Sequence, residues 1–415
     1  MAEREKRGNL PEGEAVHVSQ TDTASHSADV PPSPQTPRDI AFDILKGISI
    51  LEVICHHLLS YSARRYAVPG SIEWWTMMLA NRVLHFAVPA FLLATALLLA
   101  RSAATRVQPD WKRFYWRRAE RTLWPYLVWT LIYIAFRVQL LRAEPDILPS
   151  EVNLPWGGTV TLPVILADAK VWRSNLIWGK GYYHLYFMSV LLQFCLVFPL
   201  LFCAVKRTRP GFGMLLLVCV VLQGGAFHLH AQVLLPVLQF TTPASSLLWY
   251  LPPVLIGVWL GVHWQEWASW WSQWRIALRW LTGLGAGVYL WLSWRQLQGV
   301  PIPSPMFNAA YLAYATGIAL ELLAWCQHLV AQRIGDVLAR IGDWSLPLFL
   351  VHPAVLFFFG GPRATQWLNA LPAPFLWLAL MVLTASWGVT ALVWRLKADR
   401  LLFGRSLAPS AARSS

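Results

Sequence analysis

The sequence predicts an all-α polytopic membrane protein with about ten transmembrane helices, and three observations support this. Of the 415 residues, 56% are hydrophobic and only 13% are charged, whereas soluble domains carry about a quarter charged residues. The mean hydropathy is +0.44, and a soluble protein with so much apolar sequence would leave a large apolar surface exposed. The 25 Trp and 12 Tyr residues favour the membrane–water interface.

Apolar runs define the expected spans, since crossing a bilayer takes roughly 20 residues of helix. The fifth run is the weakest, because Gly224, Gly225, His228 and His230 interrupt it. The transmembrane domain is expected to occupy residues 38–400. The runs lie near residues 40–61, 77–100, 122–140, 183–204, 212–229, 245–263, 277–294, 306–327, 344–361 and 372–395.

The two ends of the chain read as tails. Residues 1–37 are polar, contain Pro and Ser and lack periodicity, so a disordered tail is expected. No apolar stretch near Met1 suggests a cleaved signal peptide. Residues 401–415 are expected to form a second, short tail.

Basic loop residues predict the orientation, because cytoplasmic loops carry an excess of Lys and Arg. With ten spans, the gaps after the second, fourth and tenth runs all lie on one side of the membrane. Both termini are therefore expected in the cytoplasm. The expected location is the plasma or inner membrane. The segment 141–181 would then lie outside, and Arg64 and Arg65 are exceptions on that side. The basic residues of the three gaps are Arg101, Arg106, Lys112, Arg113, Arg117, Arg118 and Arg121, then Lys206, Arg207 and Arg209, then Arg395, Lys397, Arg400 and Arg405.

The net charge of +13 and the five cysteines do not indicate a nucleic-acid partner, a metal site or disulfides. The basic residues sit in short gaps between apolar runs, where they orient helices and contact anionic lipid. No nucleic-acid partner is therefore expected. The cysteines all fall in apolar runs without metal-ligand spacing, so we expect buried small side chains and neither a metal site nor a disulfide framework.

The first run, "RDIAFDILKGISILEVICHHLLSY", carries the densest set of ionisable residues. Such residues inside a span suggest a functional site. Lys46 and His57 are eleven positions apart, which on a helix puts them within about 20° of one face and about 16 Å apart in rise. Asp43 lies one turn before Lys46 and can pair with it. The competing interpretation is an interfacial Asp43–Lys46 ion pair, with histidines that only hydrogen-bond other helices.

Glu52 and His56 form a separate i,i+4 pair in the same run. His56 is expected to be a structural partner or a group that supports His57. Glu52 is a candidate contact for the substrate.

A basic cluster, "FYWRRAERTLWPY", precedes the third span. Arg118 and Arg121 are spaced i,i+3 and are expected to share a helix face, and paired guanidinium forks suit phosphate. Arg117 is a weaker candidate for the same role. The alternative for all three is anchoring under the positive-inside rule.

Two further histidines are candidate substrate contacts. His184 begins the fourth span within the aromatic cluster "GKGYYHLYF", although an interfacial histidine is usually structural. His352 lies in mid-span before Pro353, so a polar function or a helix broken by proline is expected there.

These residues occur in an order that resembles membrane-bound acyltransferase family 3, whose members O-acylate surface glycans and other acceptors. The ordered set is Lys46, ten residues and His57; Arg118, two residues and Arg121; "YYHLYFMSVLL"; and "GDWSLPLFLVHP". The resemblance covers roughly residues 38–400. Two departures are Lys46, where the family often has Arg, and Pro89–Ala90 in "HFAVPAFLLATALLLA", where it usually has "F…SGF".

The resemblance implies an acyl-CoA-dependent O-acyltransferase with acetyl-CoA as the expected cytoplasmic donor and a glycan or lipid-linked acceptor. Arg118 and Arg121 would hold the donor's phosphates. Lys46, partnered by Asp43, would line the donor's path or bind its phosphate, and both residues are counted with His57 as candidate catalytic residues. His57 would act as general base or carry the acyl group. No hydrolase-like domain of the G-D-S type follows the last span, so no fused second catalytic domain is expected.

Two other classes explain part of the sequence. A transporter of a small or lipid-linked substrate would also have many helices and intramembrane charges, but it predicts repeated halves, which the sequence does not contain. A lipid-scaffolding protein leaves His57 unexplained.

Overall fold

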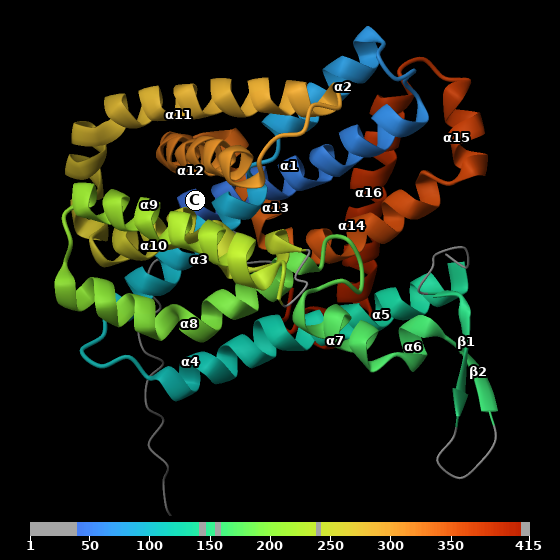
Figure 1. Cartoon of the computed structure of the whole chain (residues 1–415), viewed down its shortest axis with the longest axis horizontal. Coiled ribbons are helices and arrows are strands. Elements are labelled where there is room, and N and C mark those ends of the chain that lie inside the picture. Colours follow the sequence, from blue (N-terminus) through green and yellow to red (C-terminus); the bar gives the residue numbers. More distant parts are fainter. Residues whose placement is uncertain (1–39, 141–146, 154–158, 238–241, 408–415) are drawn as a thin grey trace, which may run out of the picture. The chain divides into compact units, whose positions relative to one another are not determined.

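The computed structural model describes residues 40–140, 147–153, 159–237 and 242–407, and these are almost entirely helical (Figure 1). The expected tail 1–37 and residues 408–415 of the second tail lie outside the described residues. The helices are α1 (Ile40–Arg65), α2 (Ile72–Val83), α3 (Ala87–Ala104), α4 (Trp111–Arg118), the π-helical η1 (Ala119–Leu123), α5 (Trp124–Leu140), α6 (Val164–Ala167), α7 (Ala169–Ile177), α8 (Tyr186–Thr208), α9 (Phe212–Leu229), η3 (His230–Leu234), η4 (Pro243–Ser245), η5 (Leu247–Tyr250), α10 (Leu251–Val262), η6 (Trp264–Glu266), α11 (Trp267–Leu297), α12 (Ser304–Leu329), α13 (Arg333–Asp343), α14 (Ser345–Phe359), α15 (Pro362–Asn369), α16 (Pro374–Arg395) and α17 (Asp399–Phe403).

Every expected span coincides with a helix, but the number of crossings is not confirmed. Within the described residues, six helices are long and apolar enough to cross a membrane. Two bent pairs, η5–α10 with η6–α11 at 86° and α13 with α14 at 71°, raise the number to as many as eight. The segment α1 is not among them, although it is 26 residues long, and it carries Asp43, Lys46 and Glu52.

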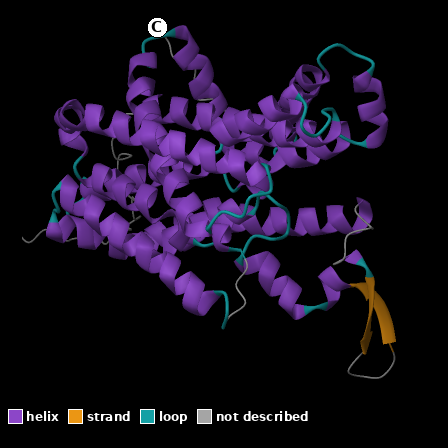
Figure 2. Cartoon of the chain, turned by 45° about the horizontal axis from the view of Figure 1, so that its top comes forward, coloured by secondary structure: helices purple, strands orange, loops and turns teal. Residues whose placement is uncertain are grey.

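A short β-hairpin departs from the all-α expectation. The strands β1 (Pro149–Asn153) and β2 (Thr159–Pro163) pair antiparallel, with Pro149 opposite Pro163 and Asn153 opposite Thr159. Figure 2 shows these two strands beside an otherwise helical chain. They lie in the segment 141–181, for which the sequence analysis predicted no strand. Each strand has only five residues, and alternation over so short a stretch is a weak signal for a strand.

Close contact between α1 and α13 fixes the helix that carries His57. A Cβ atom at Gly47 would collide with the backbone carbonyl of Leu338, and one at Gly342 would collide with the carbonyl of Asp43. Small residues allow helix backbones to approach in this way. The α1 segment also packs against α2, α12 and α14, so its polar face is held from several sides.

Gly342→Ala is therefore expected to destabilise the protein, although alanine normally favours a helix over glycine by about 1 kcal/mol. The added methyl group would push α13 away from Asp43, and such overpacking costs roughly 1–3 kcal/mol. The measurement is the thermal midpoint of the protein in detergent. Gly283→Ala in α11, where the new Cβ meets open space, is the control and should not lower the midpoint. Equal midpoints for the two variants would contradict close α1–α13 packing.

Candidate functional site

His57 lies between two cavities. The larger, here called the tyrosine cavity, has a volume of about 190 Å³. The smaller, here called the histidine cavity, has a volume of about 50 Å³. One imidazole can therefore be reached from both. The tyrosine cavity is lined by His57, Ser60, Tyr61, Arg64, Tyr182, Tyr183, Pro353, Leu356 and Phe357. The histidine cavity is lined by Glu52, Val53, His56, His57, His85, Ala87, Val88, His184, Tyr186, Phe187 and Phe349.

Three histidines from distant parts of the chain meet here. His57 of α1 stacks on His352 of α14 with ring centroids 5.5 Å apart. His184, in the loop before α8, is 6.0 Å from His352. Tyr183 stands edge-on to His57 at 4.9 Å. All three sequence-predicted histidines are thus brought to one place.

The backbone of α14 fixes the tautomer of His352. Its Nδ1 lies 3.0 Å from the carbonyl oxygen of Leu348, and because a carbonyl only accepts, Nδ1 must carry the hydrogen. Pro353 has no N–H to give to the Phe349 carbonyl one turn earlier, and the same imidazole also contacts that carbonyl. Nε2 of His352 is buried without a hydrogen-bond partner, and His352 lines neither of the two cavities at His57.

His184 is placed by a glycine turn ahead of α8. Gly179 has φ +66°, and a Cβ atom there would strike the backbone of Tyr186, so this turn favours glycine. Both ring nitrogens of His184 are buried without a hydrogen-bond partner. His184 is buried just ahead of the helix that begins at Tyr186. A neutral imidazole in this place could donate from one ring nitrogen and accept at the other.

Glu52 and His56 do not hydrogen-bond each other, although the sequence spaces them i,i+4. Glu52 is buried, and its Oε2 has no hydrogen-bond partner. Nδ1 of His56 lies 3.0 Å from the Asn81 carbonyl oxygen, and Asn81 Nδ2 donates to the His56 carbonyl at 2.7 Å. Glu52 still lines the histidine cavity.

The sequence analysis missed His85. It occupies the break between α2 and α3, stacks on His56 at 4.8 Å, and its Nδ1 lies 3.3 Å from the Tyr289 hydroxyl. The signal was present, because His85 lies within an apolar run and an imidazole at membrane depth suggests a function.

Lys46 forms the expected ion pair. Its Nζ lies 2.6 Å from Oδ1 of Asp43, which is buried. Neither residue lines the two cavities at His57. The pairing is confirmed, and a role for the pair in the donor's path stays a prediction.

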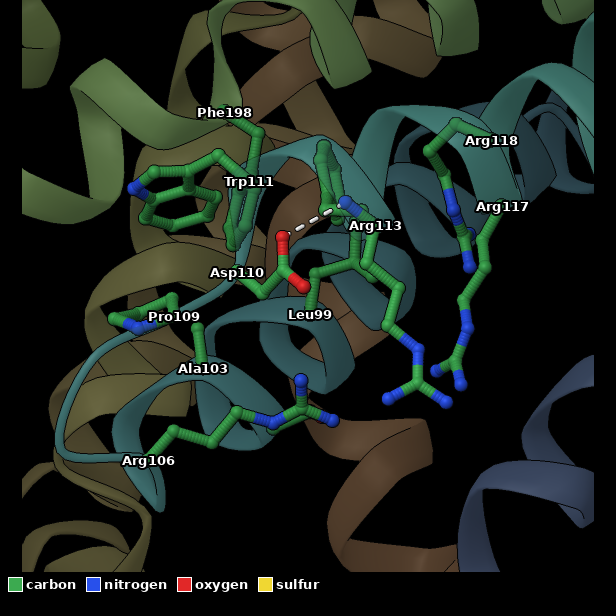
Figure 3. Close-up of a pocket in the computed structure, with 12 residues that line it drawn as sticks. Leu99, Ala103, Arg106, Pro109, Asp110, Trp111, Arg113, Arg117, Arg118 and Phe198 are labelled. Carbon is green, nitrogen blue, oxygen red and sulfur yellow. Dashed lines mark hydrogen bonds between the residues drawn. The ribbon is translucent and has the colours of Figure 1, made fainter. Parts of the chain in front are cut away.

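Arginines gather at a third cavity, here called the arginine cavity, of about 90 Å³. It is lined by Arg106 from the loop after α3 and by Arg113, Arg117 and Arg118 of α4. Asp110 caps α4 by accepting from the Arg113 amide at 2.9 Å. Figure 3 shows the four arginine side chains around one region of the close-up, which concentrates positive charge suited to phosphate.

Arg121 does not line the arginine cavity. The π-helical turn η1, Ala119–Leu123, follows Arg118, and a π-helix has more residues per turn than the α-helix that the i,i+3 argument assumes. Arg118 is half-buried, with its guanidinium 5.8 Å from the Phe114 ring centroid, whereas Arg121 is exposed. Arg113 and Arg117 are spaced i,i+4 on α4 and both line the arginine cavity. The sequence analysis did not consider this pair.

The geometry defines a helical membrane protein with a buried histidine site between two cavities and a basic cavity elsewhere on the chain. Within the described residues, no group of three or more His, Cys, Asp or Glu side chains could hold a metal ion. The sequence model of an acyltransferase domain matches residues 39–393. The chain therefore belongs to acyltransferase family 3 and is a membrane acyltransferase. No match was found in the comparisons with curated proteins and with solved structures.

Proposed function

We propose that the protein is an O-acyltransferase that moves an acyl group, expected to be acetyl, from cytoplasmic acyl-CoA to a hydroxyl of a glycan or lipid-linked acceptor. The observation that carries the proposal is the position of His57 between two cavities. A donor and an acceptor that arrive by different routes can then meet at one imidazole.

His57 performs the proton transfer in one version of the reaction. It takes the proton of the acceptor hydroxyl as that oxygen attacks the thioester carbon, the C–O bond forms, the C–S bond breaks, and His57 returns the proton to the leaving sulfur. In the other version His57 first accepts the acyl group and the acceptor hydroxyl then removes it. In both, His352 and His184 contact the substrate or orient His57.

The donor's phosphates are proposed to bind at the arginine cavity. Guanidinium groups pair with phosphate through two parallel hydrogen bonds, and the cavity has four of them. Arg121, which the sequence analysis paired with Arg118, stands outside it and serves as an anchor at the membrane surface. The paired Lys46 and Asp43 are proposed to line the donor's path toward His57.

The acceptor is proposed to enter the tyrosine cavity, and Glu52 is proposed to contact the substrate from the histidine cavity. Both termini are proposed to lie in the cytoplasm, because the basic loop residues favour that orientation. The protein would then span the plasma or inner membrane, in contact with its lipids.

The proposed function predicts a covalent product in the host. Mass spectrometry of surface glycans and lipids should find one acylated species in cells that contain the chain, and lose it in cells from which the gene is deleted. Restoring the chain should restore the species. A transporter would instead redistribute its substrate without a mass increase, and that result would contradict acyl transfer.

A further inference from the structure

Two arginines at the end of α1, Arg64 and Arg65, differ in their surroundings. Both are exposed. Arg64 lines the tyrosine cavity together with His57. Arg65 does not line it, and its Nε donates to the Tyr61 hydroxyl at 3.3 Å. Arg65 can therefore serve as a control for Arg64, since both are exposed arginines at the end of α1 and only Arg64 lines the cavity.

One face of α1 connects His57 to Arg64. The cavity-lining residues of this helix are His57, Ser60, Tyr61 and Arg64. Seven positions of an α-helix return to within about 20° of the same face and rise about 10 Å. A ligand that places a hydroxyl at His57 can thus extend along this face to Arg64.

The only charged side chain among the described residues that line the tyrosine cavity is positive. Its lining contains Arg64 and no carboxylate. Within the part of the chain that the structure describes, no acidic side chain forms an ion pair with Arg64. A guanidinium binds a carboxylate or phosphate through charge-assisted hydrogen bonds, so this cavity favours a ligand that brings its own negative charge.

The remaining walls suit a sugar. The Tyr182 and Tyr183 rings lie 4.8 Å apart and offer flat apolar faces with hydroxyl tips. Ser60 adds a hydroxyl group along the α1 face, whereas the Tyr61 hydroxyl donates to the Gly360 carbonyl and accepts from Arg65. The cavity therefore combines surfaces for a ring that carries hydroxyls with a single cation at one end.

We propose that Arg64 selects the acceptor by binding an anionic group, so that the preferred acceptor is an acidic glycan with its reactive hydroxyl at His57. The inference rests on the proposed function, because it concerns the acceptor of the same site. Arg64 would be a specificity-determining residue with no part in proton transfer.

The test compares two sugars that differ in one charged group. Binding of methyl β-D-glucuronide and of neutral methyl β-D-glucoside is measured by calorimetry with the full chain in phosphatidylcholine nanodiscs. The acidic sugar should bind about tenfold more tightly, the factor that one charge-assisted hydrogen bond supplies. Arg64→Gln should remove this preference while keeping glucoside binding, and Arg65→Gln, the matched control, should keep the preference.

Several results would overturn the proposal: equal affinity for the two sugars, binding of neither, or a preference that survives Arg64→Gln. Nanodiscs that contain phosphatidylglycerol separate a sugar anion from a lipid headgroup. If that lipid abolishes the preference, Arg64 binds headgroups and the proposal is wrong. A wild-type protein that prefers the acidic sugar but never acylates any acceptor would contradict the proposed function and leave the binding role of Arg64 standing.

Discussion

Replacing His57 with alanine is expected to abolish acyl transfer while the protein still accumulates in the membrane. Among the residues that the structure describes, His57 alone lines both the tyrosine and the histidine cavity. Alanine removes the nitrogen that takes the hydroxyl proton or carries the acyl group, and neither His352 nor His184 lines the tyrosine cavity to replace it. Loss of a general base alone costs typically 10²–10⁴-fold in rate, and loss of a nucleophile can cost about 10⁶-fold.

The measurement is the release of CoA from acetyl-CoA by purified protein in the presence of an acceptor extract. His328→Ala is the matched control, because His328 is an exposed histidine that lines none of the three cavities described. It should retain wild-type activity. Full activity of the His57→Ala protein would remove His57 from the mechanism.

Much of the fold could be predicted because lipid demands long apolar runs. Each such run is mainly helical, although the run 77–100 is divided between α2 and α3. The breaks were less predictable: the turn at His85 interrupts the expected span 77–100 without a preceding Gly or Pro signal. The expected span 344–361 does begin at the break between α13 and α14, but the sequence did not indicate the 71° bend between these two helices. The count of crossings changes with such bends.

The candidate site was predictable where one helix carries it and less so where several elements meet. The Asp43–Lys46 pair follows from i,i+3 spacing and is present at 2.6 Å. The contact between His57 and His352 joins α1 to α14, a separation that no periodicity within a run can reveal.

Changing Arg113 and Arg118 together to lysine is expected to weaken the binding of acetyl-CoA. Lysine keeps each charge but replaces the planar fork with a single ammonium group, so a bidentate phosphate contact is lost. Hydrogen bonds to charged groups contribute about 1.5–3 kcal/mol, and the exposure of Arg113 favours the low end. A loss of about tenfold in affinity for each arginine is expected.

The same substitution should leave the protein's orientation unchanged, because lysine serves the positive-inside rule as well as arginine does. The measurement is calorimetric titration of the purified variant with acetyl-CoA and with acetyl-pantetheine, which lacks the nucleotide and its phosphates. Only the affinity for acetyl-CoA should fall, since the pantetheine arm has no phosphate for the arginines to bind.

Arg121→Lys provides the control for position. Arg121 lies outside the arginine cavity and is exposed, so its replacement should leave the affinity for acetyl-CoA within experimental error. If the Arg113→Lys/Arg118→Lys protein binds acetyl-CoA as tightly as the parent, these arginines are membrane anchors. A loss of affinity in Arg121→Lys alone would instead return the donor site to the Arg118–Arg121 pair. Lys46 would be the next candidate if neither variant loses affinity, because it is the cation on α1 nearest in sequence to His57 on the N-terminal side.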